Sequence, residues 1–284
     1  MTERLVGVLR GGLVDPAAPL LCGDDMGVLR GDGCFESVRV RGTGEPVDLD
    51  AHLARLARSA AALELPEPDP AAWRELTRQL LARWAGSGRA GEGALRLVLT
   101  RGPETGTAPT AFATLGPVPA EVLRQRQEGV RAVTLRRGLT ADATVEAPWL
   151  LGGVKALSYA VNMAALRYAR SAGAEDVVFV SADGQLLEAP TASVVWLVGD
   201  VLHTPPPEPL GILDSVTVRA LFANAAGHGF DTEIRRGTPA DLHGADGVWL
   251  VSSIRIAAAV TALDGKPLRS VPSATARLRT AAGA

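Results

Sequence analysis

Lys155 is the residue of this sequence best suited to covalent chemistry. It follows a short apolar run, Leu-Leu-Gly-Gly-Val at residues 150–154, and precedes a stretch with helical periodicity. Burial in apolar surroundings favours the neutral amine, which is the form of lysine that attacks aldehydes. The alternative is a surface lysine whose stem lies along apolar residues while its amine stays in water.

Glu188 is the second candidate, because a predicted β-hairpin delivers its carboxylate to a turn of small residues at 189–193. A carboxylate in that position can bind a protonated pyridine nitrogen. The ring then stays cationic and withdraws electrons from a neighbouring carbanion. An amine for an aldehyde and a carboxylate for a pyridine together suit pyridoxal 5'-phosphate. The alternative for Glu188 is an exposed glutamate at the end of a strand.

A cofactor phosphate requires backbone donors at a helix start, together with hydroxyl groups and a cation. The stretch Asp-Ser-Val-Thr at 214–217 supplies such a helix start. Ser252 and Ser253 at the end of an apolar strand add hydroxyls, and Arg55 on a predicted helix adds the cation. Each has a simpler explanation, since serines often cap elements and a helix arginine is usually solvated.

The helices and strands that position these residues belong to a chain that is long and apolar enough to form a large core. The sequence has 284 residues, of which 47% are hydrophobic and 21% charged. We expect a smaller N-terminal α/β domain at 1–117 and a larger C-terminal α/β domain at 118–284 that carries Lys155, divided at the proline-containing stretch 116–120.

Local patterns predict individual elements in both halves. Capping residues predict helices that begin near Asp50, Asp69 and Ser215, and the helix after Lys155 is expected over 156–172. Turn dipeptides predict hairpins at 183–184 and 199–200. Alternation or apolar runs predict strands at 4–9, 33–40, 94–101, 111–115, 130–136 and 247–251.

The net charge and the cysteine content limit the classes of function that fit this sequence. A net charge of −2 and a pI near 6.1 give no long-range field for nucleic acid or an acidic membrane, so small-molecule partners are favoured. No signal-peptide core or membrane span is visible, which predicts a cytoplasmic protein. Cys22 and Cys34 are too few for a disulfide framework or a zinc site, so no metal is expected.

The order and spacing of the candidate residues resemble the class IV aminotransferases, which are pyridoxal-phosphate enzymes of fold type IV. The resemblance covers nearly the whole chain. It is carried by residues 31–36 (Gly-Asp-Gly-Cys-Phe-Glu), 52–56 (His-Leu-Ala-Arg-Leu) with Ser59, Lys155, Glu188, 213–217 and 252–253. It implies a two-domain α/β (α+β) fold like that of D-amino acid and branched-chain aminotransferases. It also implies a homodimer whose active site lies between the two domains and is closed by a loop of the partner subunit.

The resemblance also implies residue roles. Lys155 would hold the cofactor covalently, Glu188 would bind the pyridine nitrogen, and the phosphate would be bound by Arg55, Val216, Thr217 and Ser253. Tyr159 is a further candidate near the phenolic oxygen, or else a core tyrosine. The chain departs from the family at Ser193, where asparagine is usual, and at Ser215, where glycine is frequent. These departures put the cofactor affinity in doubt rather than the identity of the cofactor.

Two reactions of the family stay open. Residues 31–35 look like the 4-amino-4-deoxychorismate lyases, in which Lys155 would transfer protons as 4-aminobenzoate and pyruvate are released, a step toward folate. Residues 100–106 lack the second arginine-glycine-tyrosine segment of typical lyases. Arg101 or Arg39 could instead bind a substrate carboxylate, beside Phe35, in an aminotransferase for D-amino acids or branched-chain amino acids with a 2-oxo acid acceptor. A third possibility is a protein that binds cofactor without turnover.

Overall fold

The computed structural model describes residues 4–88, 91–106 and 108–284, which form two compact units. The first unit comprises Met1–Pro119 with Val154–Tyr159, and the second comprises Ala120–Gly153 with Ala160–Ala284. The domain division after residue 117 stays a prediction. The segment that contains Lys155 belongs to the first unit, whereas the sequence analysis assigned Lys155 to the second domain.

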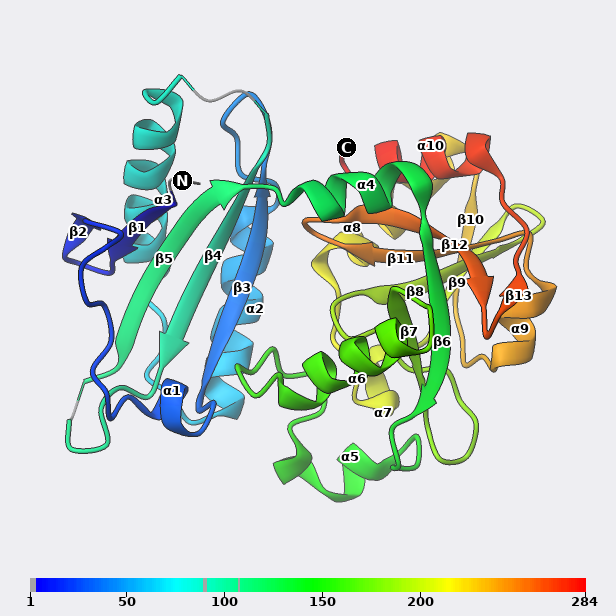
Figure 1. The fold of residues 1–284 in the computed structure, drawn as a ribbon, viewed down its shortest axis with the longest axis horizontal. Helices are drawn as coiled ribbons and strands as arrows, with labels where there is room; N and C mark the ends of the chain where they lie inside the picture. Colours follow the sequence, from blue (N-terminus) through cyan, green and yellow to red (C-terminus); the bar gives the residue numbers. More distant parts are fainter. Residues whose placement is uncertain (1–3, 89–90, 107) are drawn as a thin grey trace. The chain divides into compact units, whose positions relative to one another are not determined.

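An antiparallel five-stranded sheet forms the first unit, with strand order β2-β1-β5-β4-β3. Helix α2 packs against β3, and α3 packs against β1 and β5, so both helices cover one face of the sheet (Figure 1). The elements are β1 (Leu5–Val8), β2 (Gly12–Val14), α1 (Met26–Leu29), β3 (Gly33–Val40), α2 (Leu49–Ala62), α3 (Pro70–Ala85), β4 (Gly93–Thr100) and β5 (Thr110–Pro117).

The alternation of side chains predicted for β4 shows which face of the first sheet is buried. Leu95, Leu97 and Leu99 are buried in the cluster that includes the apolar stripes of α2 and α3. Because successive strand side chains point to opposite faces, Arg96 and Val98 lie on the other face. The sheet therefore has a helix-covered core face and a second face that carries polar side chains.

The helix boundaries test the capping predictions. Asp69 caps α3 as predicted, since its carboxylate accepts hydrogen bonds from the amides of Ala71 and Ala72. Asp50 was predicted to cap α2, and this prediction was wrong. The cap position is Asp48, and Asp50 lies in the first turn, where it forms an ion pair with Arg74 at 2.8 Å.

A mixed eight-stranded sheet forms the second unit, with order β10-β9-β8-β11-β12-β6-β7 and β13 paired to β12. Its strands are β6 (Val130–Arg136), β7 (Asp176–Val180), β8 (Ser193–Val198), β9 (Val201–Thr204), β10 (Asp231–Ile234), β11 (Gly247–Ser252), β12 (Ile256–Leu263) and β13 (Lys266–Pro267). Its helices are α4 (Ala120–Glu128), α5 (Ala143–Glu146), η1 (Pro148–Leu150), α6 (Ala160–Ser171), α7 (Pro207–Leu210), α8 (Val216–Asn224), η2 (Ala225–His228), α9 (Pro239–Gly244) and α10 (Pro272–Ala281).

The helix predicted over 156–172 begins only at Ala160, so the predicted start was wrong. The residues before it are extended along β3, which is the edge strand of the first sheet. The amide of Phe35 donates to the carbonyl of Lys155 at 3.1 Å, and the amide of Leu157 donates to the carbonyl of Gly33 at 2.8 Å. These hydrogen bonds pair backbone groups at the open edge of the sheet. This pairing outweighs the helical preference of the local sequence.

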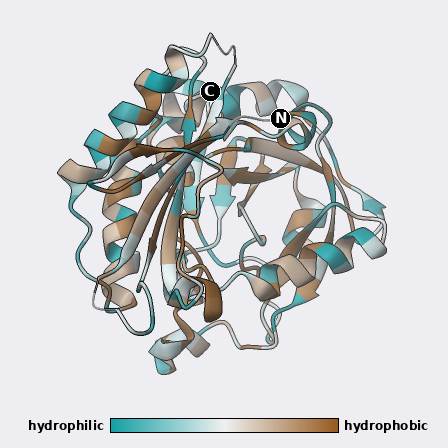
Figure 2. Ribbon diagram, turned by 60° about the vertical axis from the view of Figure 1, so that its left-hand side comes forward, coloured by the Kyte–Doolittle hydropathy of each residue, from teal (hydrophilic) through white to brown (hydrophobic). Residues whose placement is uncertain are grey.

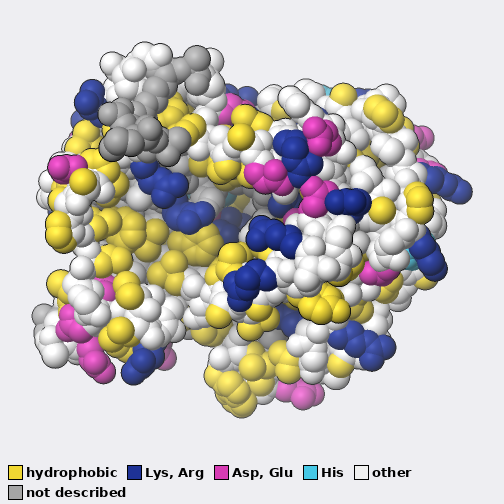
Figure 3. All heavy atoms as spheres, in the orientation of Figure 1, with side chains coloured by type: hydrophobic (Ala, Val, Ile, Leu, Met, Phe, Trp, Pro, Cys, Tyr) yellow, Lys and Arg dark blue, Asp and Glu magenta, His cyan; other side chains and the backbone are white. Residues whose placement is uncertain are grey.

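Hydropathy and charge are distributed as this architecture requires. The strands carry most of the hydrophobic colour in Figure 2, while the helices alternate between hydrophobic and hydrophilic faces. On the face displayed in Figure 3, basic and acidic side chains are scattered among the others. Within the described residues, no helix has the length and apolar character needed to cross a membrane.

Candidate active site

Lys155 is half-buried in the first unit, with its amine against two aromatic rings. Its Nζ lies 4.4 Å from the ring centroid of Phe35 and 6.0 Å from that of Tyr159. The two rings pack edge to face with their centroids 5.3 Å apart. The Lys155 amide also donates to the Ser59 hydroxyl at 3.2 Å. The structure thus brings together three predicted site residues, Lys155, Phe35 and Tyr159, and the main chain of the lysine is tied to both β3 and α2.

Arg55 belongs to a buried cluster with Glu36 and His52. The Arg55 guanidinium donates to the Glu36 carboxylate through Nε at 2.7 Å and through Nη2 at 2.8 Å, and His52 Nδ1 lies 2.8 Å from the same carboxylate. The Glu36 side chain is fully buried. Burial opposes its ionisation, but the hydrogen bonds from Arg55 and His52 outweigh burial and lower the pKa of Glu36 to about 2.

The sequence analysis did not identify Glu36 and His52 as partners of Arg55. The signal was present, since Glu36 occupies an inward position of an alternating strand and His52 lies three residues before Arg55 on one face of α2. Cys34, also inward on β3, is buried, and burial next to Glu36 raises the pKa of its thiol to about 12. Cys34 therefore stays a protonated core residue.

The two arginines predicted to bind substrate already hold ion pairs. Arg39 is buried and pairs with Glu92 at 2.5 Å. Arg101 donates to the Asp32 carboxylate at 2.6 and 3.2 Å and to the carbonyl of Leu63 at 2.7 Å. The hydrogen bond with Asp32 raises the pKa of Arg101. Their substrate-binding role stays a prediction, and it requires a carboxylate to compete with these partners.

In the second unit, Glu188 is held beside the segment that leads into α8. One carboxylate oxygen accepts a hydrogen bond from the Leu213 amide at 3.1 Å, and the other lies 3.8 Å from Nη1 of Arg137. Its main-chain carbonyl accepts from the amide of Phe179 at 2.9 Å. Arg137 follows β6 and was not among the predicted residues. Its only sequence signal was an arginine pair at the end of that strand.

The start of α8 has the donors that an anion site requires. Ser215 caps the helix as predicted, because its hydroxyl accepts from the Val218 amide at 3.2 Å. The amides of Val216 and Thr217 donate to no residue in the described part of the chain. Helix-start amides of this kind bind phosphate. The serine that replaces the frequent glycine therefore has a capping function here.

Ser252 and Ser253 lie where β11 ends and the turn to β12 begins. Helix α8 packs against β11, the strand that ends at Ser252. Ser193, the other departure from the family pattern, begins β8 and is buried, with its Cα paired to Val251 of β11. Ser193 and Ser252 thus lie on neighbouring strands of one sheet, and Ser253 lies in the turn that follows Ser252.

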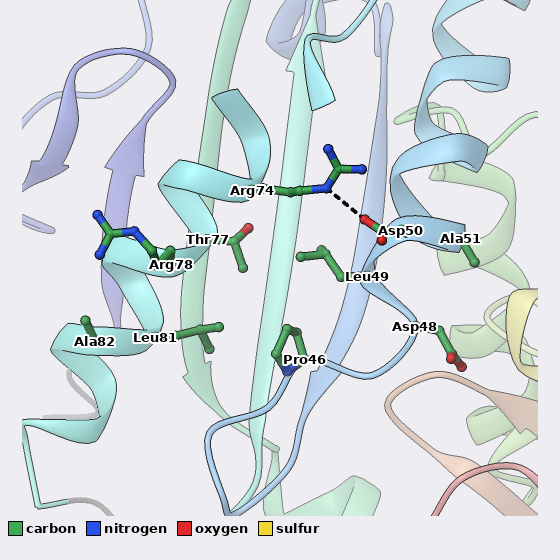
Figure 4. Close-up of a pocket in the computed structure, with 10 residues that line it drawn as sticks. All are labelled: Pro46, Asp48, Leu49, Asp50, Ala51, Arg74, Thr77, Arg78, Leu81 and Ala82. Atoms are coloured by element: carbon green, nitrogen blue, oxygen red, sulfur yellow. Dashed lines mark hydrogen bonds and ion pairs between the residues drawn. The ribbon is translucent and has the colours of Figure 1, made fainter. Parts of the chain in front are cut away.

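A shallow groove in the first unit has no part in this arrangement. It lies between the start of α2 and the outer side of α3 (Figure 4). Arg74 and Asp50 point toward each other across it. None of the predicted site residues lines this groove.

The residues present fit pyridoxal phosphate. The half-buried amine of Lys155 suits its aldehyde, the Glu188 carboxylate suits its ring nitrogen, and the helix-start amides of α8 suit its phosphate. This donor set contains each type of group that the cofactor requires.

Comparisons with known proteins agree with this chemistry. Residues 33–263 match the family model described as amino-transferase class IV. The chain is 47% identical over 277 residues to a Mycobacterium tuberculosis protein named bifunctional aminodeoxychorismate lyase / D-amino acid transaminase, covering 95% of each chain.

Two solved structures share the whole fold. One is a hypothetical aminotransferase from Mycobacterium tuberculosis in an alpha-ketoglutarate and PMP bound form, with a TM-score of 0.94 and 47% identity over 98% of each chain. The other is a fold IV transaminase from Curtobacterium pusillum, with a TM-score of 0.93 and 40% identity over 99% of this chain and 100% of that chain. This protein therefore belongs to the class IV aminotransferase family.

Proposed function

We propose that this protein is a pyridoxal-phosphate-dependent 4-amino-4-deoxychorismate lyase that also has D-amino acid transaminase activity. The observation that carries the proposal is the half-buried amine of Lys155, fixed by the β3 edge and Ser59 and packed against Phe35 and Tyr159. The Mycobacterium tuberculosis relative, whose name combines both activities, supports the pairing of the two reactions.

Each predicted residue receives a role in this proposal. Pyridoxal phosphate, when bound, supplies an aldehyde for covalent attachment and a cationic ring that stabilises negative charge on the adjoining substrate carbon. Lys155 attaches the cofactor through its amine, and Glu188 binds the ring nitrogen. The phosphate is bound by Arg55, Val216, Thr217 and Ser253, and Tyr159 donates toward the phenolic oxygen.

Lys155 would have a second task as a proton carrier. Its amine would accept and return protons at the substrate, which in the lyase reaction accompanies loss of pyruvate and formation of 4-aminobenzoate. Aromatisation of the product ring drives that reaction. The Phe35 and Tyr159 rings pack against the amine and hold it in a partly desolvated position.

Transamination is the second candidate function, and the same residues support it. Lys155 would remove the proton from the substrate α-carbon, as the conversion of a D-amino acid or branched-chain amino acid into a keto acid requires. The solved relative with bound alpha-ketoglutarate supports a 2-oxo acid as the acceptor. Arg101, Arg39 and Phe35 remain the predicted substrate-binding residues.

The proposal includes a homodimer and a cytoplasmic location. Large apolar side chains are exposed on α5 and η1 of the second unit, among them Val145 at 64% and Trp149 at 76% exposure. Exposed apolar side chains of this size on neighbouring short helices favour burial against another chain. A sedimentation experiment that finds only monomers at micromolar concentration would contradict the dimer.

Product analysis tests the reaction. The purified, cofactor-loaded protein is incubated with aminodeoxychorismate, and in parallel with D- and L-amino acids plus 2-oxoglutarate or pyruvate. Release of 4-aminobenzoate with pyruvate, together with slower amino transfer from D-amino acids, is expected. Amino transfer without any 4-aminobenzoate would replace the lyase by a transaminase, and absence of both would overturn the proposal.

A further inference from the structure

The turn between β11 and β12 carries Ser253, one of the residues assigned to the cofactor phosphate. Ser252 ends β11 and pairs with Ile256, the first residue of β12, so the turn consists of residues 253–255. Ile256 has a φ of 61°, in the left-handed region that a β-branched residue seldom adopts. A residue strained in this way persists only where the surrounding structure fixes it. The turn therefore depends on contacts with other elements of the second unit.

Arg255, the last residue of the turn, makes one such contact. Its side chain is buried, and its Nη1 donates to the Asp176 carboxylate at 2.7 Å. Asp176 is fully buried, and its other carboxylate oxygen accepts from the amide of Val177 at 2.8 Å. Asp176 begins β7, and β6 lies between β7 and β12 in the sheet. The ion pair therefore joins the turn to a strand that is not paired with either of its own strands.

Two helices hold the main chain around the turn. Arg126 of α4 donates to the carbonyl of Ile254, and Arg279 of α10 donates to the carbonyl of Ala257 at 3.0 Å. Arg279 also donates to the carbonyl of Arg126, which joins the two helices. These hydrogen bonds fix the backbone on either side of Arg255, and the ion pair with Asp176 fixes Arg255 itself.

A buried ion pair is a costly way to hold a turn, because both charged groups lose their hydration. What the pair provides is direction, since a hydrogen bond between a guanidinium and a carboxylate has a narrow range of favourable geometry. Ser253 lies two residues before Arg255 in the same short turn, so the position of one restricts the other. Helix α8, whose first amides are the other phosphate donors of this unit, packs against β11, which leads into the turn.

We propose that the ion pair between Arg255 and Asp176 positions Ser253 to bind the cofactor phosphate. The inference rests on the proposed function, in which Ser253 and the start of α8 bind that phosphate. Arg255 and Asp176 are positioning residues, because they act on the cofactor through Ser253. Loss of the pair should therefore weaken the hold on the phosphate rather than on the pyridine ring.

Three variants test this assignment. Arg255→Gln removes the ion pair, and Arg255→Lys keeps a charge for Asp176 without the guanidinium geometry. Asp241→Asn is the matched control, because it breaks a 3.0 Å ion pair with Arg235 elsewhere in the same unit. The cofactor-free proteins are titrated with pyridoxal phosphate. Arg255→Gln is expected to raise the Kd about tenfold, Arg255→Lys should raise it less, and Asp241→Asn should leave it unchanged. Urea unfolding shows which variants fold, and Arg255→Lys carries the test if Arg255→Gln does not.

Two further measurements separate positioning from a general loss of stability. Pyridoxal, which lacks the phosphate, should bind the Arg255 variants and the wild type alike, including no binding by any of them. At saturating pyridoxal phosphate, the phosphorus NMR resonance of the bound cofactor should change in the Arg255 variants and match the wild type in Asp241→Asn. An unchanged Kd, an unchanged resonance, or an equal loss of affinity for pyridoxal and pyridoxal phosphate would overturn the inference. Failure of the wild type to bind pyridoxal phosphate would instead overturn the proposed function.

Discussion

Glu36 is the residue on which the position of Arg55 depends. It is fully buried and binds the guanidinium through both carboxylate oxygens, with His52 as a further partner. Without Glu36, Arg55 would lose a buried carboxylate partner. We therefore expect this pair to fix the position of the guanidinium whether or not a cofactor is bound.

Glu36→Gln is expected to destabilise the protein by about 3–5 kcal/mol, because breaking a buried ion pair leaves an uncompensated charge. It should also weaken pyridoxal-phosphate binding, since Arg55 loses its orientation. Urea unfolding and cofactor titration measure the two effects. Glu75→Gln, which breaks an exposed pair with Arg78, is the control and should change neither. Equal results for the two variants would contradict the role of Glu36.

The pH dependence of stability follows from the same carboxylate. Its pKa is about 2 in the folded protein, below the ordinary value of about 4.3 for an unfolded glutamate. A depressed pKa contributes stability that is complete above the unfolded value and is lost as the pH falls toward the folded value. The unfolding free energy of wild type relative to Glu36→Gln should therefore shrink between about pH 4.5 and 2. A difference that stays constant over that window would contradict this assignment.

At the scale of elements, the start of α8 provides the sharpest test of the phosphate site. Val216 occupies the first helical position, where proline is tolerated, and Ser215 before it has the extended backbone that a following proline requires. Val216→Pro thus removes one amide donor and keeps the helix. Cofactor affinity is expected to fall about tenfold, the value of one charged hydrogen bond. Val216→Ala, which keeps the amide, is the control. Equal affinities of the two variants would exclude this amide from the site.

Elements were predictable from sequence where local chemistry decides them. The Asp69-Pro70 pair located α3, and Ser215 located α8, because capping depends on neighbouring residues alone. The start of α6 was not predictable. The predicted helix began at residue 156, but residues 155–157 pair in extended form with the open edge of β3, and a partner distant in sequence leaves no local signal.

The same limit applies to the candidate site. Lys155, Glu188 and the helix start at 215–217 could be proposed from the sequence because each has a distinctive neighbourhood in the chain. The ion pairs of Arg39 and Arg101 were not predictable, since they depend on which strands and loops meet. Spacing can therefore identify candidate cofactor residues more readily than the ion pairs of candidate substrate residues.

At the scale of the whole molecule, the family match extends from β3 to β12 and thus includes residues of both units. The groups assigned to the cofactor are likewise distributed over both, with Lys155 and Arg55 in the first unit and Glu188 and Thr217 in the second. We therefore expect cofactor binding to stabilise the protein as a whole. Thermal unfolding followed by separate probes in the two units should show a shared upward shift of Tm with pyridoxal phosphate, and a shift confined to one unit would contradict the assignment.

Identification of the lysine that carries the cofactor tests the central claim most directly. The sequence has only two lysines, Lys155 and the exposed Lys266 of β13, so the experiment has a built-in comparison. The loaded protein is reduced with borohydride, digested, and mapped by mass spectrometry, alongside Lys155→Ala and Lys266→Arg. The account predicts the reduced adduct on the Lys155 peptide in wild type and Lys266→Arg, and neither adduct nor activity in Lys155→Ala. An adduct on Lys266, or full activity without Lys155, would contradict it.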